Sequence, residues 1–361
     1  MRSRYLLLSL LPLVAACDSN SNFTTPEPTA PPEPSTVFVA NQGGFGANTS
    51  SITSFGLGST EASQLFTGAL GSTVQSASVV GGRLYVMSDE AGRIDVVDVD
   101  ARDRVAQITD DDLTTARYFA AASATKAYVT QLYLPDGSFS GGRVAVLDLQ
   151  ANAVTGVIED ERFANPEGVA VVGSRAFVSN PAFGSGTTLS VIDTATDAVT
   201  GTIEIGCAAR AVLPDAADGE LYAFCGEEVV VVAAGTEDVA RRFPVPAALR
   251  PLGTSGLGQD AALAVEGAAF DMVAVGTGGV LLLDAETDAM SAVAVAGERS
   301  ISAVGLSGED GGVLVLGRPD VGNPFSVPGV VTTHRTDGTL IATLPAGIYP
   351  TSVAFAGADA R

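Results

Sequence analysis

The sequence predicts an all-β fold, a seven-bladed β-propeller built from four-stranded antiparallel blades. Three observations predict it. A short strand motif recurs along the chain, an alternating strand that often ends in Asp follows the motif, and Gly, Asp and Ser turns separate the strands. A repeat of about 40–50 residues is typical of propellers, in which each repeat forms one sheet.

The first 16 residues have the features of a bacterial secretory signal. Arg2 and Arg4 precede an apolar run, which ends in small residues ahead of Cys17. The run is too short and wrongly flanked for a membrane-spanning helix. Because residues 14–17, Val-Ala-Ala-Cys, resemble a lipobox, we expect removal of a signal peptide at 1–16 and lipidation of Cys17. A plain cleaved signal is the alternative.

Residues 17–35 are predicted to form a disordered tether that begins at the lipidated Cys17. The segment consists mainly of Ser, Thr, Asn and Pro and offers little apolar surface to bury. We expect it to hold the propeller, residues 36–361, away from a membrane of the bacterial cell envelope. The outer membrane or cell surface is expected in preference to the inner membrane, and the leaflet stays open.

The charge of the chain argues against a nucleic-acid partner. Removal of Arg2 and Arg4 from the 19 basic residues leaves 17 against 41 acidic residues, a formal charge of −24. Such a surface repels phosphate backbones and anionic lipid headgroups. The expected contact with a membrane is therefore made through the lipid anchor.

The repeated motif is a short strand that ends in a small or polar residue. Seven copies are found, centred on Phe38, Tyr85, Tyr128, Phe177 and Tyr222, with weaker copies at Val273 and Leu314. The alternating strand that follows ends at Asp98, Asp148, Asp193 and Asp284. Because Asp side chains accept hydrogen bonds from backbone N–H groups in tight turns, the segment Asp-Thr-Ala-Thr-Asp at 193–197 is predicted to be structural.

The two ends of the repeat region predict how the ring closes. No strand precedes the first motif except the tether, whereas residues 349–357 have the form of an inner strand without a motif after them. We expect this C-terminal strand to join the N-terminal blade. Residues 36–357 span 322 positions, or 46 for each of seven blades.

Motifs such as AYVTQ and AFVSN, followed by VIDTATDAVTGTI, resemble the seven-bladed YVTN-repeat, YncE-like propellers of bacterial envelopes. The resemblance covers nearly the whole predicted propeller and implies the fold. It implies little about activity, because few activities are assigned to that family. The pattern is blurred in blades five and six, where the blade boundaries are not defined.

Two cysteines lie in the propeller. We expect Cys207 and Cys225 to form one disulfide, since thiols of exported domains are normally oxidised. A pair of buried free thiols is the alternative. Two cysteines without a nearby histidine are a poor metal site.

The sequence contains no obvious catalytic set, and we expect no metal or cofactor. His334 is the single histidine, occupies the position of the strand-end Asp of other blades, and is expected on the surface or in a turn. The acidic run at 110–112 is interpreted as a solvated turn. Gly-rich stretches such as 41–50 lack the helix and lysine of a phosphate-binding loop.

Aromatic residues on long loops are the candidate binding site. Connections from the second to the third strand leave one face of a propeller, and four of them are long: 41–50, 131–142, 180–187 and 318–328. They carry Phe45, Tyr133, Phe139, Phe183 and Phe325. Such aromatics commonly anchor partners. The alternative is that they fold back and cap their own blades.

The leading functional hypothesis is a non-enzymatic binding or scaffold module, tethered to a membrane, whose loop face binds another envelope protein or an extracellular polymer. A hydrolase or lactonase-like enzyme is the alternative, with carboxylates such as Asp160, Glu167 and Glu298 at the axial channel and a divalent cation. A purely structural scaffold is a third possibility.

Overall fold

The computed structural model describes residues 36–71, 73–89, 92–134, 136–137, 141–245, 261–263, 272–276, 279–284, 289–295, 299–307 and 312–357. The chain divides into two units, Met1–Glu33 and Pro34–Arg361, and the described residues belong to the second. The predicted signal peptide, Cys17 and the tether lie outside them. Within the described part of the chain, no helix has the length and apolar character needed to cross a membrane.

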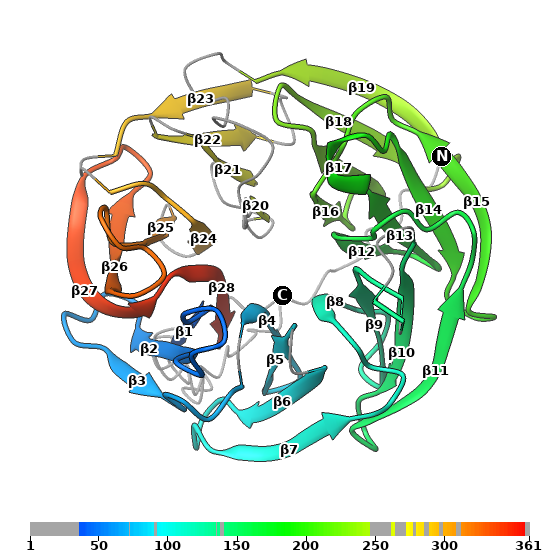
Figure 1. Ribbon diagram of the computed structural model, residues 1–361. Helices are drawn as coiled ribbons and strands as arrows, with labels where there is room; N and C mark the ends of the chain where they lie inside the picture. The colour runs from blue at the N-terminus through cyan, green and yellow to red at the C-terminus, as the bar shows by residue number, and fades with distance from the viewer. Residues whose placement is uncertain are drawn as a thin grey trace, which may run out of the picture. The chain divides into compact units, whose positions relative to one another are not determined.

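The described residues of the second unit form seven four-stranded antiparallel sheets in a propeller-like arrangement (Figure 1). The first sheet contains β28 (Pro350–Ala356), β1 (Thr36–Asn41), β2 (Ser51–Gly56) and β3 (Ser63–Leu65); the second contains β4 (Val74–Val80), β5 (Arg83–Ser88), β6 (Arg93–Asp98) and β7 (Arg104–Thr109); the third contains β8 (Ala116–Ala121), β9 (Lys126–Gln131), β10 (Arg143–Asp148) and β11 (Ala153–Glu159).

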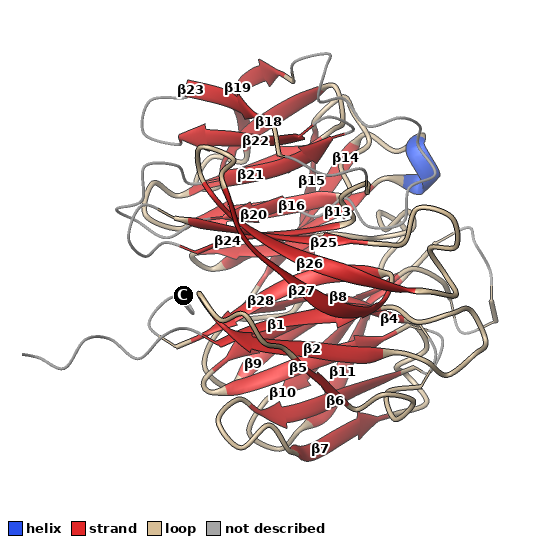
Figure 2. Cartoon of the chain, turned by 90° about the vertical axis from the view of Figure 1, so that its left-hand side faces the viewer, coloured by secondary structure: helices blue, strands red, loops and turns tan. Residues whose placement is uncertain are grey.

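The fourth sheet contains β12 (Val169–Val172), β13 (Arg175–Asn180), β14 (Thr188–Asp193) and β15 (Ala198–Glu204); the fifth contains β16 (Ala211–Asp215), β17 (Glu220–Phe224), β18 (Glu228–Ala233) and β19 (Asp238–Pro244). The sixth contains β20 (Ala261–Leu263), β21 (Met272–Gly276), β22 (Gly279–Asp284) and β23 (Ala289–Val293); the seventh contains β24 (Ala303–Ser307), β25 (Val313–Arg318), β26 (Pro328–Arg335) and β27 (Leu340–Ile348). A short 3-10 helix, η1 (Ala182–Gly184), follows β13 and lies at one end of the sheets (Figure 2).

The seven predicted motifs are the second strands of the seven sheets, β1, β5, β9, β13, β17, β21 and β25. In β5 every residue after Arg83 is buried, because the strand is covered on both sides by neighbouring sheets. The rim strand β15 instead alternates between exposed and less exposed residues along most of its length. The position of a strand between centre and rim therefore decides whether one or both faces are apolar.

The turns after the third strands confirm the predicted role of Asp. Asp193 Oδ1 accepts hydrogen bonds from the backbone N–H groups of Ala195 and Thr196 at 3.0 and 2.9 Å. Asp98 and Asp148 accept the same pair of bonds in their own sheets. In each of these turns the carboxylate accepts backbone hydrogen bonds, as expected for a structural repeat.

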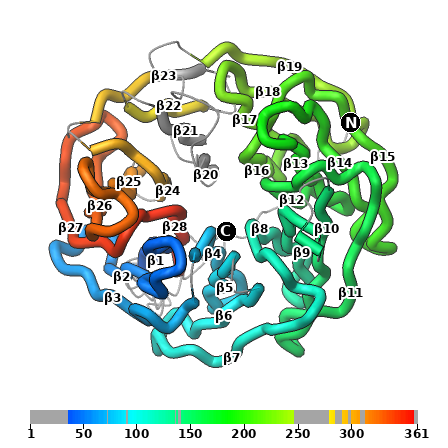
Figure 3. The backbone as a smooth tube through the Cα atoms, in the orientation of Figure 1, coloured from blue at the N-terminus to red at the C-terminus, as the bar shows by residue number. Residues whose placement is uncertain are grey.

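Buried apolar clusters lie between neighbouring sheets, and one of them joins the last sheet to the first. In that cluster Val37 and Phe55 of the first sheet pack with Val315, Val331 and Leu344 of the seventh. β28 pairs antiparallel with β1 along its length, so the two ends of the described chain lie side by side (Figure 3). The hydrophobic core is therefore distributed among the interfaces between neighbouring sheets.

The expected surface position of His334 is wrong. Its side chain is 0% exposed, its Nδ1 lies 3.1 Å from the carbonyl oxygen of Gly338, and its Nε2 lies 3.0 Å from Thr332 Oγ1. The pairing explains the error: Arg335, not His334, lies opposite the first residue of β25. A shift of one residue in a strand turns the side chain to the other face, here into the sheet interface.

Candidate functional site

The four long connections leave the same end of their sheets. Each joins the second strand to the third, and antiparallel order places the connections between successive sheets at that end as well. We call this end the loop face. Side chains from distant parts of the sequence can therefore meet there.

An aromatic stack joins two of the predicted loops. The rings of Phe45 and Phe325 have centroids 5.3 Å apart, and Phe325 stacks on Tyr349 with centroids 4.5 Å apart and planes inclined by 20°. Phe45 is 53% exposed, and the Phe325 loop also exposes Val321 and Val327, at 68% and 40%. We call these five residues the aromatic surface.

Backbone contacts hold the aromatic surface together. The N–H groups of Gln42 and Gly43 donate to the carbonyl oxygens of Tyr349 and Ile348 at 2.9 and 3.0 Å. A Cβ atom on Gly44 would lie 2.8 Å from the carbonyl oxygen of Phe325, so the two loops approach more closely there than a side chain allows. The stack therefore lies on hydrogen-bonded, closely packed backbone where the first and seventh sheets meet.

The other predicted loop aromatics have separate positions. Phe183 is 55% exposed on η1 and has a positive φ of 54°. Tyr133 is half-buried, and burial together with the Asp89 carboxylate raises the pKa of its hydroxyl. Phe139 lies outside the described residues. Phe45 and Phe325 are the pair of predicted aromatics whose ring contact brings two of the long loops together.

A charged cluster around Arg117 connects three sheets at the loop face. Arg117 Nη1 donates to Asp89 Oδ2 at 2.8 Å and to Gln75 Oε1 at 3.0 Å. Its Nη2 donates to both carboxylate oxygens of Glu167 at 2.7 Å, and its Nε donates to Glu167 Oε2 at 3.2 Å. All three nitrogens of the guanidinium take part in these bonds, and Arg117 is 6% exposed. The cluster therefore connects the second, third and fourth sheets.

The carboxylates considered for an enzyme are engaged in similar pairs. Asp160 accepts from Arg162 Nε and Nη2 at 2.6 Å, and these side-chain hydrogen bonds lower the pKa of Asp160. Glu167 is bound to Arg117, and Glu298 lies outside the described residues. Across the described ranges no three His, Cys, Asp or Glu residues are arranged to hold a metal ion. Asp112, in the acidic run, pairs with Arg143 at 3.4 Å.

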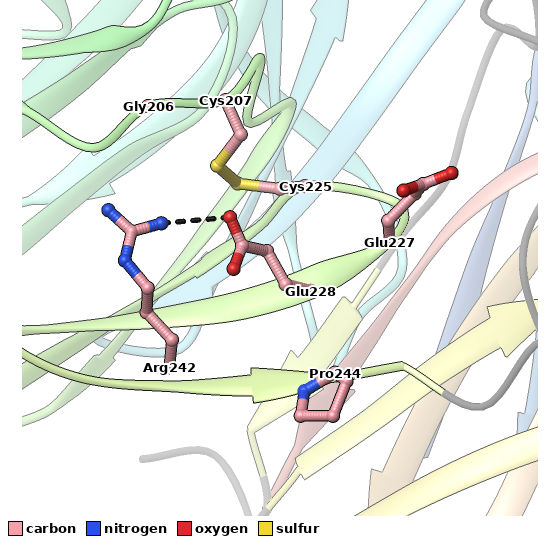
Figure 4. Close-up of a pocket in the computed structure, with 7 residues that line it drawn as sticks. All are labelled: Gly206, Cys207, Cys225, Glu227, Glu228, Arg242 and Pro244. Carbon is pink, nitrogen blue, oxygen red and sulfur yellow. Dashed lines mark hydrogen bonds and ion pairs between the residues drawn. A yellow bond between two sulfur atoms is a disulfide. The ribbon is translucent and has the colours of Figure 1, made fainter.

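The predicted disulfide between Cys207 and Cys225 is present, with Cα atoms 5.7 Å apart. It borders a pocket of about 480 Å³ on the loop face, beside the connection from the fourth to the fifth sheet (Figure 4). The pocket is lined by Gly206, Cys207, Cys225, Glu227, Glu228, Arg242 and Pro244. Arg242 Nη1 donates to Glu228 Oε1 at 2.8 Å, and Arg242 Nη2 donates to the carbonyl oxygen of Ile205 at 2.8 Å.

A family model described as Domain of unknown function (DUF5074) matches residues 35–295, well over half of the chain. The chain belongs to the DUF5074 family. The matched range contains both cysteines of the disulfide and the Arg117 cluster, and it ends before β24. The loop that carries Phe325 and the stacking partner Tyr349 therefore lie beyond the matched part of this DUF5074 protein.

Comparison with curated proteins finds no match to this DUF5074 chain. Among solved structures, 1446 chains match it, one being "Kuenenia stuttgartiensis Hydrazine Synthase". That match has 13% sequence identity and a TM-score of 0.59, and it covers 78% of this chain and 89% of the other. At this identity the likeness concerns the propeller-like fold alone.

Sequence reasoning did not find three members of the aromatic surface. The sequence pattern identifies Tyr349 only as the start of the C-terminal strand, and Val321 and Val327 belong to no motif. The usable signal was position: Tyr349 immediately precedes β28, at the end of the sheet from which the first long loop leaves. Its stacking on Phe325 depends on how the first and seventh sheets meet.

Proposed function

We propose that this DUF5074 protein is a non-enzymatic binding module of the bacterial cell envelope, whose aromatic surface docks another envelope protein. The observation that carries the proposal is the stack of Phe45, Phe325 and Tyr349, in which Phe45 is half exposed and the Phe325 loop exposes two valines. Exposed aromatic and aliphatic side chains on rigid backbone are typical of the energetic centre of a protein interface.

A protein partner fits this surface better than a polysaccharide. The Phe325 loop also exposes Val321 and Val327, whose side chains offer no hydrogen bonds to hydroxyl groups. Interface centres in proteins are depleted of charge and enriched in aromatic residues, as this one is. The backbone contacts of Gln42, Gly43 and Gly44 further favour binding. They hold the two loops together before a partner binds, so little conformational entropy is lost on docking.

The remaining parts of the proposal concern how the module is held. We infer that Cys17 carries the lipid, that residues 17–35 form the leash, and that the protein is related to the YVTN-repeat, YncE-like propellers. We also infer that β28 closes the ring by completing the first blade. The lipobox and the Pro-rich composition support the first two inferences, and the pairing of β28 with β1 supports the last.

Site-specific photo-crosslinking tests the docking proposal. In one variant of the full-length protein, expressed in intact cells, a photoreactive phenylalanine analogue would replace Phe45. In a second variant the analogue would replace Val105, which is 49% exposed on the rim strand β7. We expect a defined envelope protein to crosslink from position 45 and not from position 105.

Binding of that partner, once purified, would then be measured for Phe45→Ser, Val321→Ser and the matched control Val105→Ser. Loss of a hot-spot aromatic is expected to weaken binding by at least about tenfold, while Val105→Ser leaves it unchanged. Equal crosslinking from both positions, or equal affinity of Phe45→Ser and Val105→Ser, would contradict the proposal. A polysaccharide as the retained partner would contradict it as well.

A further inference from the structure

The pocket beside the disulfide contains chemistry that docking at the aromatic surface does not use. Cys207 and Cys225 are both half-buried and both line the pocket, so the disulfide forms part of its wall. The Arg242 guanidinium and the Glu228 carboxylate lie next to it (Figure 4). A disulfide reacts with a thiolate only if the thiolate can reach a sulfur atom, and a cation nearby stabilises the thiolate form.

We propose that this pocket is a site of thiol–disulfide exchange with a small aminothiol. The thiolate of the incoming molecule attacks one sulfur of the Cys207–Cys225 disulfide, a mixed disulfide forms, and the other cysteine leaves as a thiolate that takes up a proton. A second aminothiol attacks the mixed disulfide and releases the first cysteine. Two electrons and two protons thus pass to the protein, and the aminothiol leaves as its own disulfide.

The charges of the lining residues select the class of thiol. Glu227 and Glu228 contribute two carboxylates against the one guanidinium of Arg242, in a chain of formal charge −22. This field attracts a molecule with an ammonium group and repels one with a carboxylate or sulfonate. Arg242 is held beside the disulfide by its bonds to Glu228 and to the carbonyl oxygen of Ile205, and the excess of carboxylate among the lining residues favours an ammonium group on the incoming thiol.

Exchange would loosen one particular connection. Cys207 lies between the fourth and fifth sheets, and Cys225 follows β17 directly. Between them lies the hairpin of β16 and β17, which also pairs through its backbone from Ala211↔Phe224 to Asp215↔Glu220. Because the hairpin keeps these backbone bonds, the disulfide can open while the sheet persists.

The test measures reduction of the folded full-length protein by cysteamine and by 2-mercaptoethanesulfonate, without denaturant. Free thiols are alkylated at intervals and counted by mass spectrometry, while circular dichroism reports whether the sheets persist. Each rate is divided by the rate of the same thiol with a small linear peptide disulfide, which removes differences in thiol reactivity. We expect reduction without loss of the β-sheet signal and a normalised preference for cysteamine of about tenfold or more.

Two variants assign the preference to the pocket. In Glu227→Gln/Glu228→Gln the normalised preference is expected to fall to within about threefold. The matched control Glu61→Gln/Glu159→Gln removes the same charge from the connection between β2 and β3 and from the end of β11, in the first and third sheets, and it should keep the preference. Reduction that requires denaturant would overturn the proposal and leave a structural disulfide. A preference equal in both double variants would overturn the assignment to an aminothiol.

Discussion

Arg117 and Glu167 form a bidentate ion pair, with both carboxylate oxygens 2.7 Å from Arg117 Nη2, between the start of β8 and the connection that leads to β12. The same guanidinium binds Asp89 of the second sheet. Burial disfavours the charged form of Arg117, but the Glu167 and Asp89 carboxylates raise its pKa above the ordinary value. The arginine therefore stays charged and holds two carboxylates that would otherwise repel each other.

Replacement of Arg117 by Leu is expected to destabilise the domain by about 3–5 kcal/mol, because two largely buried carboxylates lose their cation. Urea unfolding followed by circular dichroism measures the change. The more exposed pair of Arg83 and Asp98 provides the comparison, and Arg83→Leu should cost much less than Arg117→Leu because solvent screens that pair. Similar losses for both variants would show that Arg117 is not an inter-sheet tie.

His334 is expected to make stability depend on pH. Burial lowers its pKa below the ordinary value of 6.5, and the nearby positive charge of Arg318 lowers it further. The unfolded chain therefore binds a proton at a higher pH than the folded protein does. The contribution of the neutral His334 side chain to the free energy of unfolding is therefore fully present above pH 6.5, and it is lost as the pH falls through the folded-state pKa.

The variant His334→Gln separates this contribution from the many carboxylates. We expect the urea midpoint of the wild-type protein to fall more steeply than that of the variant between about pH 7 and pH 5. The difference between the two curves is the relevant quantity, since the carboxylates are common to both proteins. Parallel curves would show that His334 does not titrate differently on folding.

The disulfide is expected to stabilise the domain through the loop that it closes. Its cysteines are separated by 18 positions, a loop for which the chain-entropy estimate is about 3 kcal/mol. We therefore expect Cys207→Ser/Cys225→Ser to fold, with a free energy of unfolding lower by about this amount. The wild-type protein measured in excess reductant is the control and should approach the double variant. Unchanged stability would mean that the hairpin alone determines the geometry.

Gly305 reports on the contact between the seventh sheet and β28. A Cβ atom at this position would lie 2.6 Å from Val353 Cγ1 and 2.9 Å from Phe355 Cε2, so β24 or β28 must shift. We expect Gly305→Ala to cost about 1–3 kcal/mol in urea unfolding. Gly156→Ala on the rim strand β11 is the control, because nothing lies within 4 Å of its added Cβ. A Gly305→Ala variant as stable as the control would contradict the proposed role of β28 in closing the ring.

Short-range patterns in the sequence were sufficient to predict the strands of each sheet and the turns between them. Each motif places a strand through residue alternation, and Asp193 and its counterparts make turns through bonds to residues two or three positions away. Such interactions act over a few residues, so they can be inferred without knowledge of the ring. The pairing of Cys207 with Cys225 could be inferred for a different reason, since the domain contains no third cysteine.

The candidate site was decided by contacts between segments that are distant in the sequence. The prediction for Phe45 and Phe325 placed them on one face, but only the meeting of the first and seventh sheets brings their rings together with Tyr349. His334 shows the same limit inside a strand, where a one-residue difference in pairing buried a side chain expected outside. The sequence by itself determined the repeated sheet and its turns, because these depend on local alternation and hydrogen bonding. Tertiary structure decided the aromatic surface, the Arg117 tie and the pocket, because these depend on the register and packing of separate sheets.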